Sequence, residues 1–136
     1  FVYDRNQIMA ILNQESSLME IVKLIGSDVL PDDQKLTLEI ARVIRLGFLQ
    51  QNAFHQEDTS VPMEKQFLMM ETILYLYEKC RALVNRGMPV SVLKEDKIFE
   101  RIIAIKYEVP NKELERFDEY HKDIDRFYDN VLERNG

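Results

Sequence analysis

Apolar residues recur at intervals of three and four along almost the whole chain, and no stretch sustains a period of two. The first spacing places apolar side chains on one face of an α-helix, whereas the second is typical of a half-buried β-strand. Only four Gly and four Pro occur in 136 residues, too few for the many tight turns of a barrel or sandwich. We therefore predict an all-α fold, a compact bundle of five to six helices with short loops, forming a single domain over residues 1–136.

The first helix is expected over about residues 5–24, where Gly26 is placed to end it. A break near Ser16 is the alternative, because Ser17-Leu18-Met19-Glu20 also matches a capping box. We favour one continuous helix. Its inward face is expected to hold Ile8, Ile11, Leu12, Leu18, Met19, Val22 and Ile25.

The second helix is expected to start at Pro31, since proline suits the first turn and the following Asp32 and Asp33 favour the positive end of the helix dipole. Residues 51–61 are rich in polar residues and read as a loop. The buried face of the second helix is expected to hold Leu36, Ile40, Val43, Ile44 and Phe48.

A third helix is predicted after Thr59 and Ser60, with Pro62 near its start and Gly87 at its end. Met63, Met69 and Met70 are interpreted as core-filling residues. The apolar face of this helix is expected to hold Phe67, Met70, Ile73, Leu74, Tyr77, Cys80 and Val84.

Three further helices complete the prediction: a short one over residues 89–94, one over residues 96–107 and a last one opened by Pro110 and Asn111. The region around 101–107 is the least helical in character, because several of its residues are β-branched. The packed seam of the last helix is expected to hold Leu114, Phe117, His121, Ile124, Tyr128 and Val131.

Charge and motif content exclude several classes of function. A formal net charge of −6 argues against non-specific nucleic-acid binding, which relies on Lys and Arg facing phosphates. A phosphate-binding loop needs a second Gly five residues after the first, but Pro31 follows Gly26 and Asn52 follows Gly47 at that spacing. No apolar run approaches 18 residues, so we expect no direct membrane insertion.

Catalytic and metal-binding residues are not predicted within this chain. A di-iron bundle needs a Glu-x-x-His motif on two helices, and only Asp118 and His121 come near that spacing, once. The single cysteine, Cys80, excludes an internal disulfide. A small bundle enzyme that uses Cys80 with His55 or His121 stays open, although a cysteine on a buried face is usually a small apolar residue.

The segment 28–34 has two interpretations. The simpler one is a helix stop, a turn and a charged helix start. The functional one is an acidic bend, stiffened by proline, that a partner contacts. The segment consists of Asp28, Val29, Leu30, Pro31, Asp32, Asp33 and Gln34.

The segment 50–55 likewise has two interpretations. It reads Gln50-Gln51-Asn52-Ala53-Phe54-His55. One interpretation is a polar helix exit with an aromatic residue tucked into the core. The other is an exposed Phe54 that stacks on a planar ligand, as aromatic side chains do on nucleic-acid bases.

These two segments carry a resemblance to a known family. Residues 26–54, followed by Asp58-Thr59, Pro62 and Lys65-Gln66, resemble the C-terminal helical domain of the catalytic A subunit of archaeal-type and vacuolar-type rotary ATPases. The string Phe-Leu-Gln-Gln-Asn-Ala-Phe at 48–54 is the most specific part, and its Ala-Phe looks closer to the A-type form than to the eukaryotic vacuolar form. The likeness is strong over residues 18–90 and weaker over the tail.

The resemblance implies a function for each segment. Phe54 matches an aromatic residue that helps line the adenine pocket, and Gln51, Asn52 and Ala53 lie beside it in the sequence. Segment 28–34 matches the loop that contacts the central stalk. Since the chain starts with Phe1 and not with Met, we expect it to be a fragment of a longer subunit whose barrel, inserted and nucleotide-binding domains lie upstream.

For the intact subunit the resemblance implies hydrolysis or synthesis of ATP from ADP, with Mg, coupled to proton or sodium transport. The implied partners are the B subunit, the upstream nucleotide-binding domain and the central stalk subunits. The implied location is cytoplasmic, peripheral on the cytoplasmic face of the membrane. We expect no cofactor in the fragment itself. The alternative is a free-standing helical module for protein–protein interaction.

The acidic bend departs from the more distant F-type motif Asp-Glu-Leu-Ser-Glu-Glu-Asp. Val29 and Gln34 replace acidic positions, Pro31 replaces Ser, and three carboxylates remain, those of Asp28, Asp32 and Asp33. Exposed ion pairs contribute roughly 0.2–1 kcal/mol each, too little for three to transmit force by attraction. We therefore predict a mainly steric contact with the stalk.

Overall fold

The computed structural model describes residues 2–49 and 63–135. All regular elements in these ranges are helical, so the all-α prediction is confirmed. None of the described helices is long and apolar enough to cross a membrane. In chain order the elements are α1 (Val2–Ile25), η1 (Ser27–Val29), α2 (Asp32–Ile44), η2 (Arg45–Leu49), α4 (Met63–Asn85), α5 (Val90–Leu93), α6 (Ile98–Ile103), α7 (Ile105–Glu108), η4 (Leu114–Arg116) and α8 (Phe117–Asn135). Of these, η1 and η4 are 3-10 turns and η2 is a π-helical turn.

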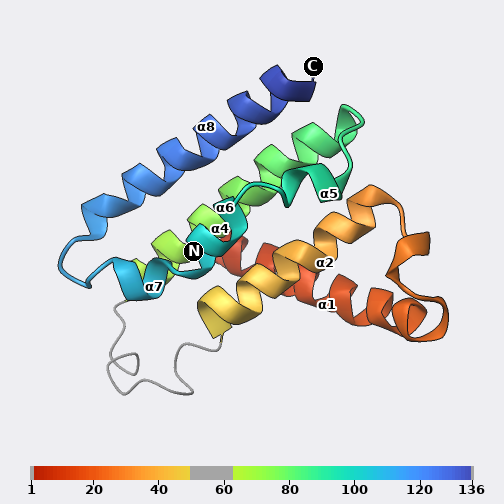
Figure 1. Ribbon diagram of the computed structural model, residues 1–136. Coiled ribbons are helices and arrows are strands. Elements are labelled where there is room, and N and C mark those ends of the chain that lie inside the picture. Colours follow the sequence, from red (N-terminus) through yellow and green to blue (C-terminus); the bar gives the residue numbers. More distant parts are fainter. Residues whose placement is uncertain (1, 50–62, 136) are drawn as a thin grey trace.

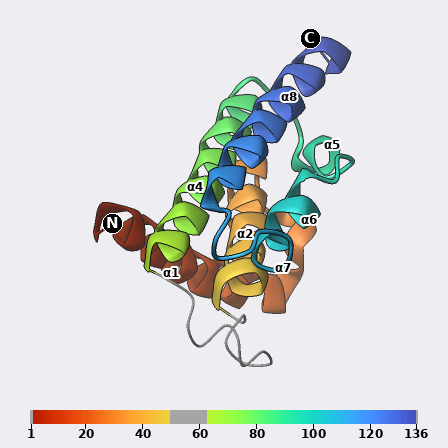
Figure 2. The same cartoon turned by 90° about the vertical axis from the view of Figure 1, so that its left-hand side faces the viewer.

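Helix α2 lies at the centre of the packing. It contacts α1, α4, α5 and α6, while α8 packs along α4 in both views (Figures 1 and 2). The predicted inward face of α2 is confirmed, because Leu36, Ile40, Val43 and Ile44 are all buried. Phe48 is partly buried and packs against the same core. Burial of one such side chain contributes roughly 1.5–3 kcal/mol, so this face holds α2 firmly in the bundle.

Helix α1 is one continuous helix, as predicted, but its inward face is much shorter than predicted. Only Ile8 and Ile11 are buried, and the assignments of Met19 and Ile25 to the core are wrong. The reason is length: α1 has 24 residues and α2 only 13. Ser17 lines a pocket together with Asp33 at the start of α2, so the last turns of α1 extend beyond the helix on which they could pack.

The segment between α5 and α8 is more divided than predicted. The expected helix 96–107 is two helices, α6 and α7, which are separated at Ala104. The last helix does not open at Pro110 and Asn111, since α8 starts only at Phe117. Val109 is extended, with φ −108° and ψ 109°, as expected of a residue that precedes a proline. The described residues therefore contain seven α-helices and not five or six.

The buried seam of α8 differs from the predicted one by two aromatic residues. Tyr120 and Phe127 are buried, whereas the predicted His121 and Tyr128 are only partly buried. Helix α8 packs against α6 as well as α4, so its apolar face is wider than one seam. The ring of Phe127 meets that of Phe99 edge to face, with centroids 6.3 Å apart. The buried residues of α8 are Phe117, Tyr120, Ile124, Phe127 and Val131.

The third predicted helix is α4, and most of its expected core residues are buried. Met69 and Met70 fill the core as predicted, but Met63 at the start of the helix is exposed, so its assignment to the core is wrong. Met63 is the first residue of α4, and the helix as a whole packs mainly against α2 and α8. The side chains of Phe67, Tyr77 and Val84, which we also expected on the buried face, are partly buried.

Candidate functional site: the bend between α1 and α2

The bend starts at Gly26, whose φ of 88° lies in the left-handed region that favours glycine. The Gly26 N–H donates to the Val22 carbonyl at 2.9 Å and so closes the last turn of α1. The Leu30 N–H donates to the Ser27 carbonyl at 3.1 Å, and the Leu30 side chain is buried. The bend is therefore a defined turn anchored in the core by one leucine.

Around this anchor the bend presents exposed side chains. Asp28, Val29, Pro31 and Asp33 are exposed. Pro31 is extended, with φ −66° and ψ 160°, and its carbonyl accepts from the backbone N–H groups of Gln34 and Lys35 at 3.0 Å each. Proline therefore fixes the direction in which the chain enters α2.

The three carboxylates of the bend have different roles. Oδ1 of Asp32 accepts a hydrogen bond from the Val90 N–H at 3.0 Å and thus caps the first turn of α5. Within the described residues, no hydrogen bond or ion pair engages the carboxylate of Asp28 or Asp33. Asp32 is consequently a structural residue, while Asp28 and Asp33 are available to a partner.

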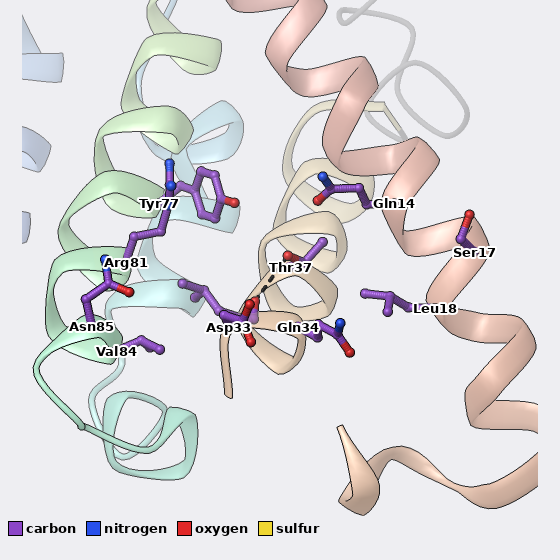
Figure 3. A pocket seen from close by; sticks show the side chains of 11 residues that line it. Gln14, Ser17, Leu18, Asp33, Gln34, Thr37, Tyr77, Arg81, Val84 and Asn85 are labelled. Atoms are coloured by element: carbon purple, nitrogen blue, oxygen red, sulfur yellow. Dashed lines mark hydrogen bonds between the residues drawn. The ribbon is translucent and has the colours of Figure 1, made fainter. Parts of the chain in front are cut away.

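A pocket lies on each side of the bend. The first, of about 470 Å³, lies between α1, α2 and α4. Figure 3 shows Arg81 and Asn85 of α4 on one side of it, Gln14 of α1 on the other, and Asp33 between them on α2. The second, of about 480 Å³, is lined by Ser27, Asp28 and Asp32 together with residues of α1, α2 and α5. The first turns of α2 therefore separate the two pockets.

Helix α2 is joined to the α5–α6 region by a charge cluster around one buried carboxylate, that of Glu39. Glu39 is only 6% exposed, and Arg42 donates to its two carboxylate oxygens at 3.1 and 2.8 Å. Arg42 also donates to Glu100 of α6 at 2.6 Å, and Nζ of Lys94 lies 3.8 Å from Glu39. The hydrogen bond to Glu39 raises the pKa of the Arg42 guanidinium above its usual value, so Arg42 stays charged at every physiological pH.

Sequence reasoning missed this cluster, although a signal was present. Glu39 stands directly before Ile40 on the apolar face of α2, with Arg42 three residues later.

A second missed residue is Lys65, which is 3% exposed. Its Nζ donates to the Val109 carbonyl at 2.8 Å and to Asn111 Oδ1 at 3.0 Å, so it ties the start of α4 to the end of α7.

The other end of α2 passes into the π-helical turn Arg45–Leu49. A Cβ atom placed on Gly47 would lie 3.2 Å from Cα of Ile103, so α6 approaches the backbone closely here. Such turns are rare and often occur next to functional sites. The residues predicted to line an adenine pocket follow directly but lie outside the described residues: Gln51, Asn52, Ala53 and Phe54.

The structure gives Cys80 and His121 no shared site. Cys80 is fully buried, and burial raises the pKa of its thiol, which disfavours the reactive thiolate. Nε2 of His121 lies 3.3 Å from Oγ1 of Thr72, and its ring packs on Tyr75 with centroids 4.8 Å apart. His55 lies outside the described residues. In the described ranges no group of three His, Cys, Asp or Glu could hold a metal ion.

Similar sequences occur in one protein family and among curated proteins. Residues 1–92 match the family described as the C-terminal domain of V and A type ATP synthase. The chain is 44% identical over 96% of its length to the V-type ATP synthase alpha chain 2 of Clostridium tetani, and spans 22% of that protein. It is 44% identical over 95% of its length to the V-type ATP synthase alpha chain of Halothermothrix orenii.

The A subunit of the A-type ATP synthase of Methanopyrus kandleri is 43% identical over 95% of this chain. In each case the chain spans 22% of the relative's own length, so it corresponds to about a fifth of such a protein. Relatives named V-type and A-type match it equally well. This chain belongs to the family of C-terminal domains of the V- and A-type ATP synthases.

Proposed function

We propose that this domain couples nucleotide occupancy to the central stalk in the catalytic A subunit of a V/A-type rotary ATP synthase. In this proposal residues 51–54, with Phe54 foremost, complete the adenine pocket of the upstream nucleotide-binding domain, which holds ATP or ADP with Mg. The bend at 28–34 contacts the stalk. B subunits alternate with the intact catalytic subunit, which couples ATP chemistry to transport of protons or sodium ions and lies peripherally on the cytoplasmic face of the membrane.

The single observation that carries the proposal is the position of the bend at one end of α2. The helix and its π-helical turn run from Asp32 to Leu49, roughly 25 Å at 1.5 Å per residue. The bend precedes one end, at the right-hand edge of Figure 1, and the predicted adenine residues follow the other in sequence. Family membership favours this reading over a free-standing adaptor.

The packing of α2 supports transmission of movement as a rigid body. The buried apolar face, the Asp32–Val90 hydrogen bond and the Glu39–Arg42–Glu100 cluster hold α2, α5 and α6 together. Protein interiors are close-packed and deform little. A displacement that starts at the Leu49 end is therefore expected to move the bend without being absorbed inside the domain.

The contact that we propose is mainly steric. Two carboxylates, those of Asp28 and Asp33, are available to the stalk, and an exposed ion pair contributes roughly 0.2–1 kcal/mol. Leu30, which belongs to the predicted contact segment, is buried and anchors the bend. The pushing surface therefore consists of the proline-stiffened backbone with Val29 and Pro31 on its outer side.

The experiment compares ATP hydrolysis with ATP-driven ion transport in the assembled complex that contains the full-length subunit. The Asp28→Ala/Asp33→Ala variant is expected to keep most of its transport per ATP. Deletion of residues 27–29 is expected to keep hydrolysis and lose transport. Complete uncoupling by the double aspartate variant would reject the steric contact, and full coupling after the deletion would reject the bend as the contact.

The adenine side has its own test. Phe54→Ala in the full-length subunit is expected to raise the KM for ATP, because stacking on an aromatic ring contributes roughly 1–3 kcal/mol per base. The 136-residue chain alone is expected to show no micromolar ATP binding in calorimetry, since it lacks a phosphate-binding loop. Tight binding by the isolated chain would contradict the division of the site between two domains.

A further inference from the structure

Two buried lysines occur at α7, at the end of the bundle opposite the bend. Lys65 is 3% exposed and Lys106 is 8% exposed. Lys65 comes from the start of α4, and its Nζ donates to the Val109 carbonyl at 2.8 Å and to Asn111 Oδ1 at 3.0 Å. In Figure 1, α7 and the start of α4 lie at the left, whereas the bend lies at the right. The charge of Lys65 is thus satisfied by oxygen atoms of its own domain.

The ammonium group of Lys106 has no such partner. Among residues 2–49 and 63–135, no hydrogen bond or ion pair engages its Nζ. The Nζ lies 4.7 Å from the centre of the Tyr107 ring, and the neighbouring carboxylate of Glu108 accepts a hydrogen bond from Tyr120 instead. An ammonium group carries three N–H donors, and burial of a charge without a partner is costly. Lys106 therefore lacks an anionic partner in the described part of the chain.

The position of Lys106 indicates which part of the complex can supply this partner. Helix α7 contacts η2, the turn Arg45–Leu49, and residues 51–54 follow that turn in the sequence. In the proposed function these residues face the upstream nucleotide-binding domain. The chain spans 22% of the length of its relatives, so most of such a subunit lies outside it. An acidic group of that domain can therefore reach this end of the bundle.

The surroundings of the ammonium group suit a protein surface. The ring beside it, that of Tyr107, belongs to a residue that is 61% exposed, and tyrosine is enriched at protein interfaces. A free phosphate would use the positive charge but would leave the exposed ring uncovered. A carboxylate carried on a protein surface would meet both. The combination of a buried cation and an exposed aromatic ring therefore favours a protein carboxylate.

We propose that Lys106 binds a carboxylate of the nucleotide-binding domain of the same subunit, while the Tyr107 ring packs against the surface that carries this carboxylate. This inference rests on the proposed function, which sets the domain that lies against this end of the bundle, and it adds the residue and the chemistry of the contact. Hydrogen bonds between an ammonium group and a carboxylate are charge-assisted and are among the strong ones in proteins. Lys106 is then a positioning residue, because it holds the helical domain against the domain that binds the nucleotide.

The test is zero-length crosslinking of the purified assembled complex that contains the full-length subunit. A carbodiimide joins a lysine amine to a carboxylate in direct contact, with loss of water, and the linked peptides are identified by mass spectrometry. We expect a link between Lys106 and one Asp or Glu of the nucleotide-binding domain. The link is expected to be absent from the Lys106→Arg variant, whose guanidinium keeps the charge but does not form the amide.

The outcomes separate this inference from the proposed function. A link from Lys106 to Glu57, to Asp58 or to another carboxylate of the 136-residue chain overturns the inference, because the charge is then paired within the domain. A link to another subunit, or no link, also overturns it, and the proposed function remains if Phe54→Ala raises the KM for ATP. A link to the nucleotide-binding domain together with an unchanged KM for Phe54→Ala keeps the contact and rejects the adenine role.

Substitution of Lys106 in the 136-residue chain tests whether its charge is unpaired there. Lys106→Met removes the charge and keeps a long side chain. The thermal midpoint of the chain is expected to stay the same or to rise, because replacement of an unpaired buried charge by an apolar group removes a cost. Lys97→Met, at an exposed lysine, is the control and is expected to leave the midpoint unchanged. A clear fall for Lys106→Met would show that the ammonium group has its partner within the chain and would overturn the inference.

The same substitutions in the full-length subunit test the contact between the domains. Lys106→Met is expected to raise the KM for ATP roughly tenfold with little change in kcat, since a hydrogen bond to a charged group contributes about that factor. Lys106→Arg keeps the charge and is expected to fall between Lys106→Met and the wild type. Lys97→Met is expected to match the wild type. Equal KM values for Lys106→Met and Lys97→Met would overturn the proposal.

Discussion

Asp32 and Val90 are 58 residues apart in the sequence, yet the Asp32 carboxylate accepts a hydrogen bond from the Val90 N–H at 3.0 Å. The side chain that opens α2 thereby caps the first turn of α5. One aspartate of an acidic bend is thus part of the scaffold, while its neighbour Asp33 has no side-chain partner among the described residues.

The first prediction compares these adjacent aspartates. Asp32→Ala is expected to lower the free energy of unfolding by about 1 kcal/mol, the usual contribution of a helix cap. Both residues lie in the first turn of α2 and share its dipole, so Asp33→Ala is the matched control and is expected to cost about 0.5 kcal/mol at most. Urea unfolding of the chain measures both. Equal losses would show that the hydrogen bond to Val90 contributes nothing.

The second prediction concerns the buried carboxylate of Glu39. Glu39→Ala removes the two-point partner of Arg42, which is 32% exposed and keeps its bond to Glu100. The expected cost is therefore about 1.5–2 kcal/mol, the contribution of hydrogen bonds to a charged group. The control is Glu20→Ala, whose exposed pair with Lys23 is worth about 0.5 kcal/mol or less. Chemical denaturation compares the two variants, and a loss for Glu39→Ala no larger than that for Glu20→Ala would contradict the role given to the cluster.

The third prediction concerns the close approach of α6 to the π-helical turn. Gly47→Ala is expected to destabilise the chain by about 1–3 kcal/mol, because the added methyl group overpacks a contact with backbone. The sign of the change in stability is decisive, since a glycine-to-alanine change in an unconstrained helix stabilises the protein by roughly 0.5–1 kcal/mol. A rise in the thermal midpoint would show that α6 can move away from residue 47.

The fourth prediction is a loss of stability at alkaline pH. Burial and the 2.9 Å hydrogen bond to Glu108 raise the pKa of Tyr120 from 10.0 to about 12. Because the pKa is raised in the native state, the protonated Tyr120 hydroxyl contributes fully to the stability of the fold below pH 10. That stabilisation is lost as the pH rises to about 12. Tyr120→Phe is expected to show a shallower loss over that interval, whereas Tyr3→Phe, at an exposed tyrosine, is expected to follow the wild type. Identical curves for all three would refute this assignment.

The sequence predicted those features that depend on periodicity and on capping residues. The continuous α1, the stop at Gly26, the start of α2 after Pro31 and the buried face from Leu36 to Ile44 all follow from local chemistry. Each of these signals depends on residues that are close in the sequence, so it can be recognised without knowledge of the fold.

The features that were missed depend on which element lies next to which. Ile25 has the spacing of a core residue, but no helix covers it in the described part of the chain. Tyr120 is buried because α6 and α7 lie beside α8, and Asp32 becomes a cap because α5 lies beside α2. The spacing of residues in the sequence does not predict which helices will be neighbours. Sequence analysis therefore gave Asp28, Asp32 and Asp33 the same role, whereas in the structure Asp32 caps α5 and the other two are exposed.

The central claim is that the domain moves as one rigid body when nucleotide binds. Spin labels are attached at Asp28→Cys on the bend and at Met63→Cys at the start of α4, two exposed positions. Pulsed electron paramagnetic resonance measures the distance between the two labels in the assembled complex. A third label on the stalk reports movement of the bend. We predict that the Asp28–Met63 distance changes by less than about 2 Å between empty and ATP-bound states while the distance from Asp28 to the stalk changes by more. A changing internal distance with a constant distance to the stalk would contradict the account.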